Sequence, residues 1–568
     1  MASVLVSCRA LVGISDLTIE DAGVDAADAP VGGDATVDVA DALTVDARDA
    51  TVLDGTNAGG DTADGTGEED VTGSEVSLTE GGDVVSTDGS EAEAASVDAA
   101  DASDAADASD AADASDAGDG SDGSLTCAHA CGTGYSCIAG HCGDEVVELA
   151  SDYHGECVVL YAGEVWCWGG NQGGELAYTA MNSDKICNGG QWACHPAPVK
   201  IPVPAVVTHV TANTDGFRCA LDTQGSVWCW GRDDQGELGY GNGGLPKCFS
   251  GAFCNVVPEK VALGTNVVAE LRAAPLNICA RTTTGTVYCW GENITGVSGL
   301  VPTFFQATPT AIALTGATEI TVGSADDENE SHACAVTGGN VLCWGSNTRG
   351  QLGHPPNMNG DITASDGGPS CYLSGPCNLT PTLVTDSLGT PLANVVRVAG
   401  GSRSSCALLG DHTLWCWGSN KNGMLGANVS SDDAAHPYPA QVVVPAGTSF
   451  TFVDNGWPWA IALDTNGKVW TWGDNGAGQL ADTTIAGSSC ASGFPCQVEP
   501  EAIPGLAGAT LVSAHGPGLA LVNGSVYVWG SNDAAQLGHV ASAAAGDTLL
   551  CPRGWPCNPT PQLMVGLP

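Results

Sequence analysis

The sequence has few basic residues: its 568 residues include 16 Lys plus Arg against 66 Asp plus Glu, giving a formal net charge of −50. A nucleic-acid-binding protein needs a basic surface to meet the phosphate backbone, and no part of this chain offers one. We therefore expect no nucleic-acid partner. No apolar run reaches the roughly 18 residues that a membrane-spanning helix needs, so membrane attachment is expected only through a lipid anchor.

Catalytic motifs are also missing. The chain has neither a phosphate-binding loop with its lysine nor a Gly-x-Ser-x-Gly nucleophile turn. The histidines are scattered, and we expect His354, His436 and His539 to be polar surface residues. The acidic run 326–330 lacks the alternating spacing and the glycine of a calcium loop, which favours a solvated loop over a calcium site. The sequence predicts a protein that is not an enzyme and holds no cofactor or metal.

Cysteine, in contrast, is abundant, with 25 residues and therefore an odd count. A reducing cytosol rarely holds so many cysteines without metal sites, and clustered Cys-x-x-Cys pairs are absent. We expect an oxidising compartment, outside the cell or on a bacterial outer-membrane surface. Glycine is also very common, at 78 residues, which suits a turn-rich all-β chain.

Three segments precede the bulk of the chain. Residues 1–15 include Leu5-Val6-Ser7-Cys8, which looks like a truncated bacterial lipoprotein signal in which Cys8 is lipidated, although only seven residues precede it. Residues 16–126 form an Asp/Ala-rich tract with little to bury, predicted to be a disordered linker. Residues 127–144 hold Cys127, Cys131, Cys137 and Cys142, which predict either a two-disulfide knot or, with His129 and His141, a zinc site.

The remainder, residues 145–568, repeats itself. The phrase Trp-Gly-x-Asn-x-x-Gly-x-Leu recurs with variations, and two short apolar runs joined by a turn precede each copy, as in a β-hairpin. A small antiparallel sheet cannot bury both faces alone, but seven sheets stacked around an axis can. The seven copies begin at Trp168, Trp230, Trp290, Trp344, Trp417, Trp472 and Trp529.

These motifs resemble those of the family named for the regulator of chromosome condensation, over about three quarters of the chain. The resemblance implies a seven-bladed β-propeller in which the two terminal segments share one blade, so that Pro561–Val565 would pair with the blade begun by Val146–Leu149. The founding member exchanges nucleotide on a nuclear GTPase, but no exchange residues map onto this sequence. Secreted bacterial relatives, including one that covers the active sites of β-lactamases, fit the expected compartment better.

Five repeats carry one cysteine on each hairpin arm. Residues placed symmetrically about a hairpin turn face each other, at a separation that a disulfide can bridge. In the sixth and seventh repeats both cysteines are replaced together, by Ile461 with Thr471 and Leu519 with Val528, as expected for bonded pairs. The predicted pairs are Cys157 with Cys167, Cys219 with Cys229, Cys279 with Cys289, Cys334 with Cys343, and Cys406 with Cys416.

A second series of pairs follows the Trp-Gly motif and closes small loops. These pairs are Cys187 with Cys194, Cys248 with Cys254, Cys371 with Cys377, Cys490 with Cys496, and Cys551 with Cys557, which leaves Cys8 over. Each loop encloses an aromatic residue, so the rings either pack within the loops or form a binding surface on one face of the propeller. The candidate ligand-binding residues are Trp192, Phe249, Phe253, Tyr372, Phe494 and Trp555, with Trp192 and Trp555 expected to be the most exposed.

We expect a monomeric recognition propeller that binds a protein or a glycan outside the cell, displayed on its acidic linker. Two alternatives from other classes remain open: a purely structural surface or envelope protein, and a guanine-nucleotide exchange factor by family analogy. A fold does not specify a function, and the sequence names no ligand.

Overall fold

The structure, a computed structural model, describes residue 127 and residues 130–568. Short gaps within this range are 180–183, 188–191, 213–215, 242–244, 249–250, 325–329, 363–370, 372–374, 457, 483–488 and 549. The predicted anchor Cys8, the predicted linker and His129 lie outside the described residues. None of the helical segments in the described part of the chain has the length and apolar character needed to cross a membrane.

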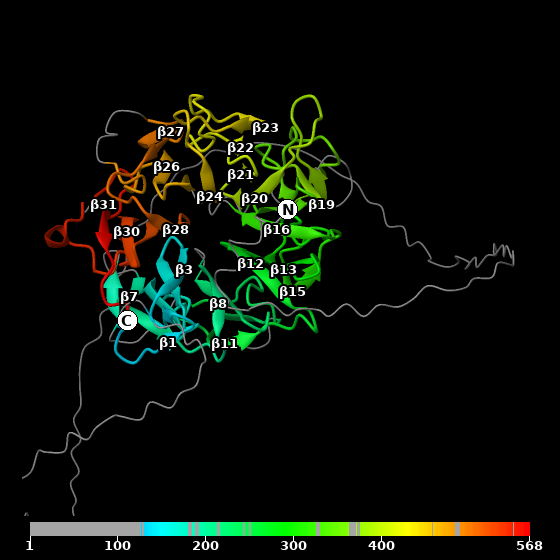
Figure 1. Cartoon of the computed structure of the whole chain (residues 1–568). Helices are drawn as coiled ribbons and strands as arrows, with labels where there is room; N and C mark the ends of the chain where they lie inside the picture. The colour runs from blue at the N-terminus through cyan, green and yellow to red at the C-terminus, as the bar shows by residue number, and fades with distance from the viewer. Residues whose placement is uncertain are drawn as a thin grey trace, which may run out of the picture. The chain divides into compact units, whose positions relative to one another are not determined.

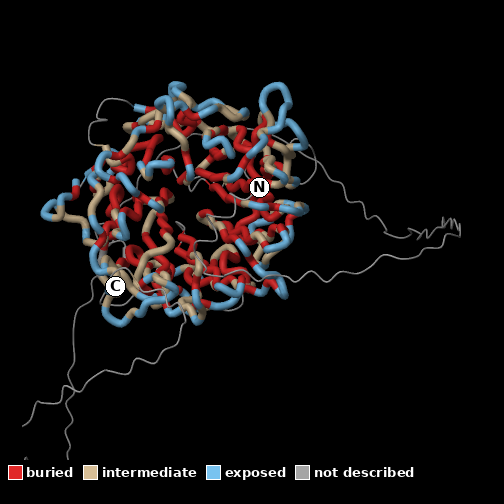
Figure 2. The backbone as a smooth tube through the Cα atoms, viewed as in Figure 1, coloured by how far each residue is buried: buried red, intermediate tan, exposed pale blue. Residues whose placement is uncertain are grey.

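The predicted all-β, seven-bladed propeller is confirmed: seven antiparallel sheets follow one another along the chain (Figure 1). Each sheet has four strands, and the first gains a fifth. Their innermost strands lie at the centre of the ring and their fourth strands at its rim. Buried residues concentrate in the inner strands, and the exposed residues lie mostly in connections (Figure 2).

The blades are contiguous in sequence. Blade 1 comprises β3 (Val146–Ser151), β4 (Gly155–Leu160), β5 (Val165–Gly170), β7 (Trp192–Ile201) and the short β6 (Lys185–Cys187). Blade 2 comprises β8 (Val207–Ala212), β9 (Phe217–Asp222), β10 (Val227–Arg232) and β11 (Cys254–Lys260). Blade 3 comprises β12 (Val268–Ala274), β13 (Asn277–Thr282), β14 (Val287–Glu292) and β15 (Phe305–Ala311).

The remaining blades repeat this order. Blade 4 comprises β16 (Ala317–Gly323), β17 (His332–Thr337), β18 (Asn340–Ser346) and β19 (Cys377–Leu383), and blade 5 comprises β20 (Val395–Gly400), β21 (Ser404–Leu409), β22 (Leu414–Ser419) and β23 (Ala435–Gln441). Blade 6 comprises β24 (Phe450–Asn455), β25 (Trp459–Asp464), β26 (Val469–Asp474) and β27 (Cys496–Ala502). Blade 7 comprises β28 (Ala509–Ser513), β29 (Gly518–Val522), β30 (Ser525–Ser531) and β31 (Cys557–Leu563).

The Trp-Gly motif joins each blade to the next. All seven tryptophans are fully buried, and each indole N–H donates to a backbone carbonyl of the preceding blade at 2.8–2.9 Å. The accepting carbonyl always belongs to the eighth of the nine motif residues in the preceding blade. For example, Trp230 of blade 2 donates to Glu175 of blade 1. The glycine that follows each tryptophan has φ between +96° and +108°, which a side chain would strain. The motif therefore sets both the strand geometry and the contact between blades.

Blade closure differs from the prediction. The last strand, β31, pairs with β30 in blade 7 and not with the first blade, so within the described residues no sheet combines β31 with the strands of blade 1. The proline-containing strand is the fourth strand of every blade, and the repeats therefore leave no strand over. Blade 7 instead packs on blade 1: Trp168 donates to the Gln536 carbonyl at 2.8 Å, and the hydroxyls of Ser151 and Ser513 lie 2.9 Å apart.

The cysteines of the propeller are joined in the pairs that the sequence predicts. In the hairpins the two cysteines are direct cross-strand partners, with Cα atoms 4.1–4.2 Å apart. Ile461 with Thr471 and Leu519 with Val528 hold the same register in blades 6 and 7. All five loop pairs after the Trp-Gly motif are also bonded.

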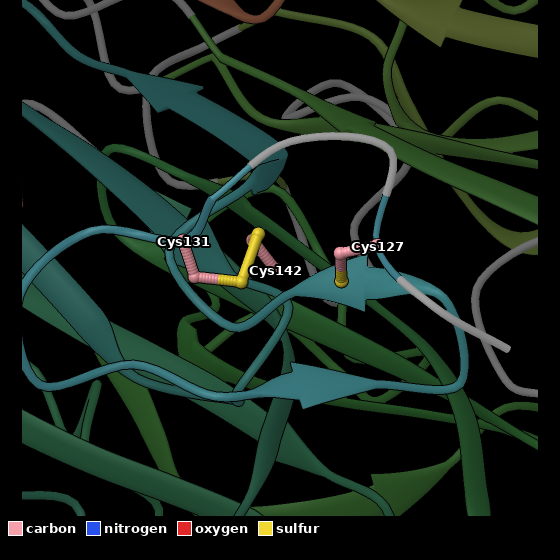
Figure 3. Close-up of side chains that lie close together, drawn as sticks. All are labelled: Cys127, Cys131 and Cys142. Carbon is pink, nitrogen blue, oxygen red and sulfur yellow. A yellow bond between two sulfur atoms is a disulfide. The ribbon is translucent and has the colours of Figure 1, made fainter. Parts of the chain in front are cut away.

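The Cys-rich segment ahead of blade 1 contains a two-stranded sheet, β1 (Cys137–Ile138) and β2 (His141–Cys142). Its disulfides join Cys127 to Cys137 and Cys131 to Cys142; Figure 3 shows the second bond with Cys127 beside it. The sulfurs of Cys127, Cys131 and Cys142 lie within 4.8 Å of one another. Because a zinc ligand must be a free thiolate, these bonded cysteines fit the disulfide alternative and not the zinc site.

Candidate functional site

The loops that carry the candidate residues lie on one face of the propeller. Each connects the third strand of a blade to the fourth, as between β10 and β11, so antiparallel pairing puts all of them at the same end of the sheets. We call this the loop face. The turns between second and third strands lie on the opposite face.

The disulfide loops contact neighbouring blades. In blade 7, the backbone N–H of Arg553 donates to the Gly476 carbonyl of blade 6 at 3.0 Å, and its guanidinium makes two hydrogen bonds of 3.0 Å to Asp474. The same guanidinium lies over the Phe494 ring, 4.5 Å from its centroid. The backbone N–H of Ser492 in the blade 6 loop donates to the Lys421 carbonyl of blade 5 at 3.2 Å. These loops therefore clamp adjacent blades together.

Two of the predicted ligand-binding aromatics take part in this packing. Phe494 is half-buried beneath Arg553, and Trp555 is half-buried with its ring edge-on to Tyr153, 5.3 Å between centroids. The expectation that Trp555 is among the most exposed candidates is wrong, because Phe253 is 46% exposed. The side chains of Trp192, Phe249 and Tyr372 lie outside the described residues.

Among the three candidates whose side chains are described, Phe253 is the exposed one. It ends the clamped loop of blade 2, and the ammonium of Lys247 lies 4.8 Å from its ring centroid. Its carbonyl accepts from the Asp233 N–H at 2.9 Å, which fixes the backbone beneath the ring. Phe253 is therefore presented on a rigid loop.

The neighbouring loop of blade 3 exposes more apolar surface. Its side chains are 42% (Leu300), 53% (Val301), 58% (Phe304) and 40% (Phe305) exposed. The loops of blades 2 and 3 are in contact, because the Gly241 N–H donates to the Ala307 carbonyl in β15 at 3.2 Å. We call Phe253, Leu300, Val301, Phe304 and Phe305 the blade 2–3 patch. Exposed apolar residues gathered on one face of a protein mark candidate interaction surfaces.

The loop of blade 3 was not among the sequence candidates. The candidates were sought between paired cysteines, and the third repeat lacks that pair. A different signal was present: residues 293–318 contain no charged residue, in a chain whose net charge is −50. An uncharged window around Leu300-Val301-Pro302-Thr303-Phe304-Phe305 identifies this loop from the sequence alone.

The propeller axis holds a network of charged residues that no sequence motif indicated. Glu148 and His209 of blades 1 and 2 lie 2.7 Å apart, and the carboxylate of Glu319 in blade 4 lies 3.8 Å from Arg272 and 3.6 Å from Arg397. Burial, and then the nearby Glu270 carboxylate, raise the pKa of Glu319 to about 7. Equivalent positions of the innermost strands meet at the axis, and in blades 1 to 5 these positions hold Glu148, His209, Glu270, Glu319 and Arg397.

The axis opens at the loop face into a cavity of about 30 Å³, lined by Gly323, Gly401, Asn455 and His515 among others. Only about one water molecule fits such a volume. The His515 ring lies 3.4 Å from the Asp454 carboxylate, so the cavity rim is also charge-paired. Among the described residues, this cavity is therefore too small for a ligand larger than water.

A further set of ionisable groups is sealed between blades 1 and 2. Arg218 forms an ion pair with Asp152, and both side chains are essentially inaccessible. Burial raises the pKa of Glu156 well above its usual range and that of Glu175 to about 7. Shifted pKa values often mark functional sites, but these groups do not face a cleft, which favours a structural role.

Three histidines of the loop face each contact an aspartate carboxylate. His354 bonds Asp361 at 2.8 Å and is 1% exposed, so the expectation of a surface role is wrong for this residue. Two similar pairs are more accessible, His436 with Asp432 and His539 with Asp547.

Within the acidic run 326–330, only Glu330 is described. Its carboxylate accepts a hydrogen bond from Thr348 at 2.6 Å and pairs with Arg403 at 2.7 Å.

Glu237→Gln is expected to stabilise the protein above neutral pH. Burial raises the pKa of Glu237 to about 8. Since the folded-state pKa exceeds the unfolded one, the stabilising contribution of the protonated carboxyl is complete below about pH 4.5 and is lost as the pH rises through 8. Glutamine holds this position in later blades, where the Gln479 and Gln536 side chains accept the same type of backbone N–H bond at 2.8 Å.

We expect Glu237→Gln to raise the free energy of unfolding by about 1–3 kcal/mol at pH 9 and to leave it nearly unchanged at pH 5. Differential scanning calorimetry at the two pH values measures it. The matched control is Glu259→Gln, an exposed position in which neither pH should show a large change. A gain of equal size at pH 5 and pH 9 would contradict the titration of Glu237.

Comparison with known proteins agrees with the repeat geometry. The model described as the regulator of chromosome condensation (RCC1) repeat matches residues 338–408, and a second model of that description matches residues 395–423 and 460–479. Residues 338–423 and 460–479 therefore match RCC1 repeats. The matched residues cover the Trp-Gly motifs of blades 4, 5 and 6, whose tryptophans make the inter-blade hydrogen bonds described above.

Several curated proteins resemble this RCC1-repeat chain. It is 25% identical to the ultraviolet-B receptor UVR8 of Arabidopsis thaliana over 62% of this chain and 69% of UVR8. It is 25% identical to the mitochondrial RCC1 domain-containing protein RUG3 of the same plant, over 66% of this chain and 79% of RUG3. It is 29% identical to the human E3 ubiquitin-protein ligase HERC2 over 49% of this chain, but that match spans 5% of HERC2.

Among solved structures, the RCC1-repeat chain is similar to one from the structure of Kap60 bound to yeast RCC1 (Prp20). The TM-score is 0.53 with 19% identity, over 71% of this chain and 83% of the other. At this identity the likeness shows the shared propeller fold. It carries no residue of a binding site across to this chain.

Proposed function

We propose that this RCC1-repeat protein is a non-enzymatic recognition propeller that binds a protein partner through the blade 2–3 patch. The observation that carries the proposal is the exposure of Leu300, Val301, Phe304 and Phe305 by 40–58%, on the same face as the 46% exposed Phe253 of the neighbouring blade. Aromatic side chains on a rigid backbone lose little conformational entropy on binding and are favoured anchors of protein interfaces. The uncharged window 293–318 favours an apolar contact surface on the partner.

The relatives support a protein partner. The solved yeast structure contains RCC1 (Prp20) bound to Kap60, so a protein that shares this fold has a protein partner there. A purely structural role would leave this exposed apolar surface without a purpose. Nucleotide exchange remains an analogy with the family, since no exchange residue maps onto the described blades.

We further propose that the protein acts outside the reducing cytosol, on a bacterial cell surface, with Cys8 as a lipid anchor and residues 16–126 as the linker. The support is chemical: 24 of the 25 cysteines form 12 disulfides. Disulfides in such number persist in oxidising compartments. Cys8 is the cysteine left over, as an anchor requires.

The test compares the wild-type protein and a patch variant as baits in a pull-down from an outer-surface extract of cells that make the protein. The affinity of each bait for the captured protein is then measured. The variant Val301→Asp/Phe305→Asp puts two charges on the patch, and we expect binding to weaken by at least about tenfold. The matched control is Leu388→Asp, which charges an 89% exposed apolar residue between blades 4 and 5 on the opposite face. Equal binding by wild type and the patch variant would refute this site.

A further inference from the structure

A second concave site lies far from the patch in the fold, between the Cys-rich segment and blade 1. Its volume is about 360 Å³, and Tyr135, Ile138, Glu164, Trp166 and Lys200 are among the residues that line it. Glu164 and Ala162 belong to the turn between β4 and β5, which places this groove on the face opposite the loop face. We call it the Tyr135 groove.

The groove is held rigidly. Backbone hydrogen bonds join the Cys-rich segment to blade 1, from the Tyr161 N–H to the Glu145 carbonyl at 2.8 Å and from the Ala162 N–H to the Gly143 carbonyl at 3.0 Å. The His141 ring stacks on Tyr161 with 4.7 Å between centroids. The inner sides of Tyr135 and Trp166 pack on the core shared by blades 1 and 7. A ligand would therefore meet a preformed surface.

Glu164 organises the polar groups of the groove. Its carboxylate accepts from the Tyr135 hydroxyl at 2.8 Å, the Trp166 indole at 3.2 Å and the Lys200 ammonium at 2.5 Å. Burial would raise the pKa of Glu164, but the hydrogen bonds from Lys200, Tyr135 and Trp166 lower it, so the carboxylate is ionised at neutral pH. Burial and Glu164 raise the pKa of Tyr135 to about 12, so its hydroxyl stays neutral.

The chemistry of the groove restricts the ligand class. One carboxylate and one ammonium cancel, which leaves no net charge to attract an anion or a cation. The Lys200 side chain is 53% exposed, so its ammonium retains donors that can reach a ligand beside the Glu164 acceptor. Two half-buried aromatic residues supply flat apolar surface, and the 42% exposed Ile138 extends it at the rim. Adjacent donors and acceptors beside aromatic rings suit a ligand with neighbouring hydroxyls and an apolar face.

We infer that the Tyr135 groove binds a neutral saccharide of one or two sugar units. The hydroxyls of the sugar would bond Lys200 and Glu164, and its C–H face would lie against Tyr135 or Trp166. This inference does not rest on the partner proposed for the blade 2–3 patch, since the two sites lie on opposite faces and share no residue.

The experiment titrates the full-length protein with glucose, galactose, mannose and N-acetylglucosamine, and follows binding by saturation-transfer NMR. We expect saturable binding of at least one of these sugars with a dissociation constant in the millimolar range. Lys200→Ala should weaken that binding by about 5- to 20-fold, and Tyr135→Phe by about threefold, because each removes hydrogen-bonding capacity.

Blade 2 offers the matched control. Lys260 is the cross-strand partner of Trp228, as Lys200 is of Trp166, but no Cys-rich segment lines that blade's equivalent surface. Lys260→Ala should leave sugar binding unchanged, and so should Val301→Asp/Phe305→Asp. Absence of saturable binding for all four sugars, wild-type affinity in Lys200→Ala, or stronger binding of the acidic sugar N-acetylneuraminate would each overturn the inference.

Discussion

Arg218→Met should lower the free energy of unfolding by about 3–5 kcal/mol at neutral pH, because it removes the cation from a sealed cluster of carboxyls. Arg218 pairs with Asp152, whose side chain is fully buried, and no water can take over the missing partner. Arg218 also offsets the effect of burial on the pKa of Glu175 and Glu156. Without it, all three acids would face one another in a dry interface.

Chemical denaturation of wild type and variant at pH 5 and pH 8 measures this loss. The loss of stability should be smaller at pH 5, since Glu175, whose pKa burial raises to about 7, is then protonated and uncharged. Arg232→Met is the matched control: Arg232 pairs with Asp234 at 2.8 Å, but both side chains are about 30% exposed, so less than about 1 kcal/mol should be lost. If the Arg218→Met variant is as stable as wild type at pH 8, the buried carboxyls do not depend on this cation for their stability in the folded protein.

Gly516→Ala should lower the free energy of unfolding by about 3 kcal/mol or more, because backbone atoms already occupy the position of the new methyl group. A Cβ on Gly516 would lie 1.8 Å from the Asp152 carbonyl oxygen, which is backbone at the contact between blades 7 and 1. Backbone in an innermost connection cannot move aside as a flexible side chain would. We expect a lower melting temperature, together with faster hydrogen exchange in β3 and β28, the two strands that meet there.

Gly505→Ala provides the comparison for this variant. Gly505 has φ +87°, so alanine is strained there, but nothing lies within 4 Å of the added Cβ. Gly505→Ala should lower the free energy of unfolding by about 1 kcal/mol, and hydrogen exchange in β3 should not change. Comparable losses in the two variants would mean that backbone conformation, and not the contact between blades, dominates at Gly516.

The sequence was sufficient for the fold because the determinants of the fold are local and repeated. The Trp-Gly phrase specifies a positive φ and a buried indole in all seven blades, and joint loss of the cysteines at Ile461/Thr471 and Leu519/Val528 revealed the hairpin register. Strand closure was predicted wrongly, because it was inferred from the family. The position of β31 as an ordinary fourth strand was present in the repeat order itself.

The candidate site was only partly accessible from the sequence. Phe253 was a candidate from the sequence and is exposed in the structure. The exposure of Trp555 depends on a contact with Tyr153, which lies about 400 residues away in sequence. A sequence pattern cannot show such packing between distant segments. The Tyr135 groove was missed for the same reason: its polar groups come from the Cys-rich segment, a blade 1 turn and a rim strand, and no motif joins them.

Blade contiguity has a consequence for how the molecule assembles. Since each sheet is formed by strands consecutive in the chain, a blade can complete its own hydrogen bonds as soon as its last strand has been synthesised. Loop-closure entropy then opposes mainly one late event, the docking of blade 7 on blade 1, where Trp168 and Gln536 are 368 residues apart. Until that event, an open arc of blades exposes two unpaired sheet faces. The earliest-made blade therefore waits longest for its neighbour, and it is the blade that carries the additional strand β6 and the disulfide-bonded segment before it.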